Sequence, residues 1–169
     1  SDHFSSRQIV VIEAMNPNPP FAPLMIDPPE HNKYRALLMP ALAPKAVSSL
    51  GEKARTLSIE LIEGFRATGE CEFIGDFATH LPIAIFMSMV NLPAEDRLDL
   101  LEIADTLVRG TSLEASLAAR AKLVAYIAQK IGERRTVPGD DLISVLTQAE
   151  IDGAPLDEST LMGMLTLVM

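Results

Sequence analysis

The chain has 169 residues, 48% of them hydrophobic, and a formal net charge of −9. A nucleic-acid-binding domain needs clustered basic residues to neutralise phosphates, so this acidic balance argues against that class. The longest apolar run, residues 81–90, is too short to span a bilayer, and we expect no membrane segment. One cysteine, Cys71, allows no intramolecular disulfide, which suits a cytoplasmic protein.

Residues 7–26 contain four prolines and two asparagines, which disfavour a regular helix or strand. The same stretch has many apolar residues, which argue against disorder. We therefore expect a long loop that folds over something apolar. A loop that packs on ordinary protein core is the competing interpretation.

The Asp-Pro-Pro-Glu sequence at 27–30 predicts a helix that begins at Asp27. Asp27 would accept from the first free amides, and Glu30 stands where a capping-box acid reaches back. His31 and Arg35 would then share one face near the positive end of the helix dipole. Arg offers a planar pair of donors and His a further one, so the pair can bind a carboxylate. A solvated pair of surface charges is the alternative.

Apolar residues recur at helical spacing from Pro44 to about Ala67 and predict one long amphipathic helix. Alternation through Cys71, Phe73 and Phe77 indicates a short strand. The next helix, at 77–89, is apolar all round and should lie in the core.

Pro93 opens a helix that should run to Arg109, and the break at 110–112 should separate it from a helix over 113–135. Asp141 can cap a short helix that ends near Ala149. A hairpin is expected around Asp152-Gly153, at residues 150–156.

Asp157 should cap a last, apolar helix. This helix reaches Met169 without a stop signal, so the chain is interpreted as an internal piece of a longer protein. No repeat or hydrophilic linker is evident. The sequence therefore predicts a mainly α fold in a single domain, residues 1–169.

The stretch from Asp27 to Arg35 resembles the start of the C helix in cytochrome P450s. Residues 2–6, Asp-His-Phe-Ser-Ser, look like the segment after the B helix in the camphor-hydroxylase branch of bacterial class I enzymes. Residues 91–96 and 132–144 also resemble family segments, in the family's order. The resemblance spans nearly the whole chain. It implies a partial cytochrome P450 fold, from the B–B′ region to the first half of the I helix.

This resemblance implies a haem-thiolate monooxygenase that hydroxylates or epoxidises a small apolar, terpenoid-like substrate with O₂ and electrons from a [2Fe-2S] ferredoxin. His31 and Arg35 would bind a propionate of haem b, and the ferredoxin would dock near Arg35. The loop at 7–26 would face the substrate. The family's substrate-contacting positions fall on Val10, Phe21, Leu24, Val108 and Leu167.

The family's axial cysteine ligand lies in a loop far downstream, so the resemblance gives Cys71 a structural role. The oxygen-activating acid–Thr pair would follow Met169, which leaves no catalytic residue in this segment. No histidine stands at a metal-binding spacing, so we expect no protein-only metal site. Pro19 replaces a Tyr that binds the ketone in the camphor enzyme, which argues against camphor as the substrate.

We expect a cytoplasmic monomer that binds neither nucleic acid nor a membrane. A competing hypothesis from a different class is a non-enzymatic helical ligand-binding or interaction domain, in which His31 and Arg35 are surface charges. A third is a P450-like fold that performs isomerisation or peroxygenase chemistry. Residues beyond Met169 would discriminate them, because the acid–Thr pair, a Glu-x-x-Arg motif and a cysteine loop define the monooxygenase.

Overall fold

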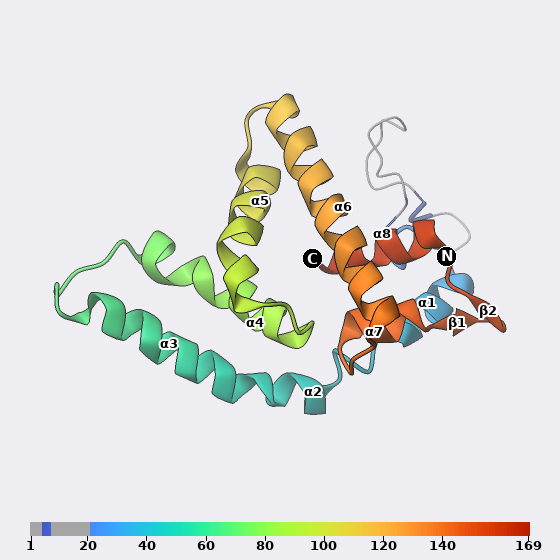
Figure 1. The fold of residues 1–169 in the computed structure, drawn as a ribbon, viewed down its shortest axis with the longest axis horizontal. Coiled ribbons are helices and arrows are strands. Elements are labelled where there is room, and N and C mark those ends of the chain that lie inside the picture. Colours follow the sequence, from blue (N-terminus) through green and yellow to red (C-terminus); the bar gives the residue numbers. More distant parts are fainter. Residues whose placement is uncertain (1–4, 8–20) are drawn as a thin grey trace. The chain divides into compact units, whose positions relative to one another are not determined.

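The computed structural model describes residues 5–7 and 21–169, and these are mainly helical with one antiparallel hairpin (Figure 1). The mainly α class is thus confirmed. Contacts divide the chain into a first unit, residues 1–40 with 124–169, and a second unit, residues 41–123. The elements are α1 (Glu30–Leu38), α2 (Pro44–Ser48), α3 (Leu50–Arg66), η2 (Ile74–Ala78), α4 (His80–Met89), η3 (Ala94–Asp96), α5 (Arg97–Arg109), α6 (Leu113–Thr136), α7 (Leu142–Thr147), β1 (Glu150–Ile151), β2 (Ala154–Pro155) and α8 (Glu158–Val168).

The core of the first unit is built from apolar side chains of the second half of α6, of α7 and of α8. The α6 contribution recurs at a spacing of four residues, so these side chains lie on one face of the helix. α7 packs against both α1 and α8. The most deeply buried apolar side chains are Ile127, Ile131, Ile143, Leu146, Leu161, Met164 and Leu165.

Two predicted N-caps in the first unit are confirmed. Asp141 accepts from the Ser144 amide at 3.0 Å, and Asp157 accepts from the Thr160 amide at 2.9 Å. The Arg134 guanidinium also donates to Asp141 at 2.8 Å, so this buried carboxylate joins α6 to α7. Each aspartate satisfies an amide of its own helix that lacks an intrahelical partner.

The hairpin predicted after α7 is also confirmed. β1 pairs with β2, with Ile151 opposite Ala154. The turn residues Asp152 and Gly153 have φ of 55° and 80°. Positive φ at both central positions is what a tight turn of a right-twisted hairpin requires, and Asp-Gly tolerates it.

In the second unit, α4 packs against α3, α5 and η2. The helix expected over 44–67 is present as two, α2 and α3, which are separated at Ser49. The helices expected over 93–109 and 113–135 are confirmed within a few residues. In α4, predicted to lie in the core, only Met87 is fully buried.

The short strand predicted at Cys71, Phe73 and Phe77 is wrong, because this stretch leads into the π-helix η2. The Phe73 and Phe77 rings stack with centroids 5.4 Å apart, a contact that suits a helical spacing of four residues. The Glu72 carboxylate accepts from the Ile74 and Gly75 amides. These local contacts favour a helical turn over an extended one.

Over residues 5–7 and 21–169, none of the helices combines the length and the apolar character needed to cross a bilayer.

Candidate functional site

Helix α1 carries the two predicted anion-binding residues, and it begins later than the sequence indicated. Its first residue is Glu30, preceded by Pro29, and no side chain caps its amides. Pro28 and Pro29 have no amide hydrogen to donate. The His31 amide donates to the carbonyl oxygen of Asp27 at 3.1 Å and so closes the turn that leads into the helix.

The prediction that Asp27 caps this helix is wrong, because its carboxylate is bound elsewhere. The Ser5 hydroxyl donates to Oδ2 at 2.6 Å, and the Ser6 amide and hydroxyl donate to Oδ1 at 2.8 and 2.9 Å. Arg7 Nε lies 3.3 Å from Oδ2. The Ser5 hydroxyl, then the Ser6 amide and hydroxyl, lower the pKa of Asp27 from 3.8 to about 2, because these bonds favour the ionised form.

His31 and Arg35 lie four residues apart in α1, so their side chains share one face. His31 is half-buried and Arg35 is exposed. Within the described part of the chain, no carboxylate lies within ion-pair distance of Arg35. The described residues therefore place no competing carboxylate at its guanidinium.

Lys33, between these two residues in sequence, is already engaged. Its ammonium lies 2.5 Å from Asp152 at the tip of the hairpin and 4.0 Å from Glu30 of its own helix. The bond to Asp152 raises the pKa of Lys33 above 10.5. Sequence reasoning missed this pair, since the two residues are 119 positions apart and no local spacing connects them.

The predicted substrate-facing residues are partly described. Phe21 and Leu24 lie in a turn before α1, where the Met25 amide donates to the Phe21 carbonyl at 2.8 Å. Leu24 is 47% exposed, and Val108, at the end of α5, is 82% exposed. Leu167 is half-buried in α8. Val10 and most of the 7–26 loop lie outside the described residues, so the convergence of this set stays a prediction.

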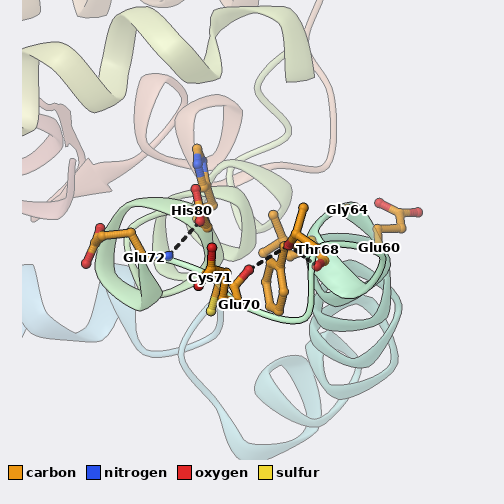
Figure 2. Close-up of a pocket in the computed structure, with 10 residues that line it drawn as sticks. Glu60, Gly64, Thr68, Glu70, Cys71, Glu72 and His80 are labelled. Carbon is orange, nitrogen blue, oxygen red and sulfur yellow. Dashed lines mark hydrogen bonds between the residues drawn. The ribbon is translucent and has the colours of Figure 1, made fainter.

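A cavity of about 720 Å³ lies in the second unit, between α3 and the start of α4 (Figure 2). Cys71, which is exposed, and His80 line it together with four acidic side chains. Two of these carboxylates already accept hydrogen bonds from nearby amides. The Asp76 carboxylate accepts from the Glu72 amide at 2.8 Å, and the Glu72 carboxylate accepts from the Ile74 and Gly75 amides. The acidic residues of the lining are Glu60, Glu70, Glu72 and Asp76.

These carboxylates make the cavity unsuitable for an anionic ligand, because like charges repel. The described residues also contain no group of three or more His, Cys, Asp or Glu side chains placed to hold a metal ion. Of these two places, α1 is therefore the one that fits an anionic group.

Comparisons of the sequence and of the structure with known proteins both find cytochrome P450s. No protein-family model matches the chain. It is 33% identical to "Cytochrome P450 109" of Bacillus spizizenii, with 98% of the chain and 42% of that protein covered. It is also 33% identical to the "Erythromycin C-12 hydroxylase" of Saccharopolyspora erythraea, with 92% of the chain and 40% of that protein covered.

Among solved structures, the crystal structure of CYP101J2 matches with a TM-score of 0.81 and 33% identity. The match covers 99% of this chain and 42% of the other. The chain thus spans about two fifths of the length of these relatives. It matches cytochrome P450s in sequence and in structure, and it has part of the cytochrome P450 fold.

Proposed function

We propose that the protein containing this chain is a haem-thiolate monooxygenase and that His31 and Arg35 bind a haem propionate. The observation that carries the proposal is the pair itself, on one face of α1 in a chain whose relatives are cytochrome P450s. The interaction-domain alternative has no such support among the relatives. Haem with a cysteine thiolate, when bound, supplies the chemistry that activates O₂ and inserts one oxygen atom.

The residues of α1 fit a propionate. Arg35 has donors in a planar arrangement that matches a carboxylate, and His31 adds a donor one helical turn earlier. The Lys33 ammonium is paired with Asp152, so it is not a further donor to the same carboxylate. The role of these residues is to bind and orient the cofactor.

The substrate proposal rests on the apolar character of the predicted contacts. Phe21, Leu24, Val108 and Leu167 offer no polar group to fix an orientation, which suits a small apolar, terpenoid-like molecule. One relative is named for the hydroxylation of erythromycin, so hydroxylation is a reaction that a related chain performs. We propose hydroxylation or epoxidation, with electrons from a [2Fe-2S] ferredoxin that docks near Arg35, in a cytoplasmic monomer.

Replacing Arg35 with Ala tests the proposal. Loss of a charged hydrogen-bonded partner is worth about 1.5–3 kcal/mol, so haem should dissociate roughly ten- to a hundredfold faster. First-electron reduction by a ferredoxin should also slow. Arg55→Ala, on the exposed surface of α3, is the matched control.

The measurements are haem transfer to apomyoglobin and stopped-flow reduction of the complete protein. Equal rates for wild type, Arg35→Ala and Arg55→Ala would show that Arg35 does not bind a propionate.

A further inference from the structure

Asp27 connects two parts of the first unit that are distant in sequence. Its Oδ2 accepts from the Ser5 hydroxyl, 22 residues earlier, at 2.6 Å, and its Oδ1 accepts from the Ser6 amide and hydroxyl, 21 residues earlier, at 2.8 and 2.9 Å. Arg7 adds a charged contact at 3.3 Å. A carboxylate that accepts three hydrogen bonds beside a guanidinium is held in one orientation.

The backbone of the same residue contacts the candidate site directly. The Asp27 carbonyl accepts from the His31 amide at 3.1 Å. The prolines at 28 and 29 restrict the chain between these two residues, because each ring fixes φ. The orientation of Asp27 is thereby transmitted to the first turn of α1, where His31 lies.

Comparison with two other aspartates excludes an ordinary capping role. Asp141 and Asp157 accept from amides of the helices that they precede, at Ser144 and Thr160. The Asp27 side chain accepts from no amide of α1. Its carboxylate binds Ser5 and Ser6 of a distant segment, so the link between that segment and α1 runs through the backbone of Asp27.

We infer that Asp27 is a positioning residue for His31, which it holds through its carbonyl while Ser5, Ser6 and Arg7 hold its carboxylate. The inference rests on the proposed function, because it takes His31 to be a propionate ligand. Partners that orient a metal ligand typically change metal affinity by about 10–100-fold when they are removed, and we expect the lower end of that range for a residue that binds a propionate.

The test compares Asp27→Ala and Asp27→Asn with Asp157→Ala in the complete protein. The first readout is hydrogen exchange of the Ser6 amide, which reports the contact without any haem. The second is the rate of haem transfer to apomyoglobin. Asp27→Ala should speed Ser6 exchange and raise haem loss about tenfold. Asp27→Asn should lie between, because an amide oxygen still accepts from Ser6, and Asp157→Ala should change neither.

A double-mutant cycle shows whether Asp27 acts through His31. If it does, Asp27→Ala should accelerate haem loss far less in a His31→Ala background than in the wild type. An equal effect in both backgrounds, or faster Ser6 exchange with unchanged haem loss, would overturn the inference. If His31→Ala alone leaves haem loss unchanged, the proposed propionate site fails instead. Should Asp27→Ala not fold, Asp27→Asn and Ser6→Ala serve in the same cycle.

Discussion

Leu146 of the first unit is fully buried, whereas the 17-residue helix α3 of the second unit has no buried residue. Both α3 and the helices of the first unit show apolar residues at helical spacing. Periodicity therefore predicted helices in both units, but it did not predict how deeply each apolar face is buried. Burial depends on which other segments cover the face, and that is a property of the tertiary structure.

The first unit should accordingly be sensitive to loss of core volume. Leu146→Ala removes a side chain that is 0% exposed, and the free energy of unfolding should fall by about 2–5 kcal/mol. Val145→Ala, at a neighbouring position that is 45% exposed, is the matched control and should cost much less. Denaturant unfolding followed by circular dichroism gives both values. Equal losses would show that α7 does not pack as described.

A smaller effect is expected at the start of α1 when the pH is lowered. The folded-state pKa of Asp27, about 2, is below the ordinary value of 3.8, so the ionised form is favoured by folding. Its stabilising contribution should be complete above about 3.8 and should disappear as the pH falls through about 2. An NMR titration of the Ser6 amide should follow that low pKa, and a midpoint near 3.8 would contradict the contacts of Asp27.

The same contacts show why sequence reasoning succeeded at two aspartates and failed at a third. Asp141 and Asp157 find their partners three residues ahead, within the window that capping rules examine. The partners of Asp27 lie more than twenty residues earlier. The shared face of His31 and Arg35 is local and was predicted, whereas the Lys33–Asp152 pair required the folded chain.

The failed strand prediction has a different cause. Phe73 and Phe77 were interpreted with the period of a strand, although a spacing of four is also that of a helix. The Glu72 carboxylate accepts from the Ile74 and Gly75 amides, and these bonds stabilise a helical turn. A carboxylate placed before a helical spacing was the sequence signal for this turn.

In the second unit, truncation on α3 should have little effect. Ile59 is 48% exposed, so Ile59→Ser should change the free energy of unfolding by about 0.5 kcal/mol or less. The measurement is the same denaturant titration as for Leu146. A loss of several kcal/mol would show that α3 is covered by another segment or by a partner, and that the two units do not differ as described.

The smallest effect on stability is expected at Val108, which is 82% exposed. Val108→Phe should leave unfolding unchanged, yet it should alter substrate affinity and the site of oxidation if this position lines the substrate pocket. Spin-state titration with terpenoid ketones and alkenes, followed by product chromatography, gives the answer. Unchanged affinities and products would place Val108 outside the pocket and weaken the assignments of Leu24 and Leu167.

The central claim, that this chain is part of a haem-thiolate monooxygenase, is tested most directly by the reduced CO-difference spectrum of the complete protein. We expect the absorption band of a thiolate-ligated haem, and we expect the same band for Cys71→Ser, because Cys71 is an exposed free thiol of the second unit. Absence of the band, or its loss in a folded Cys71→Ser variant, would contradict the account.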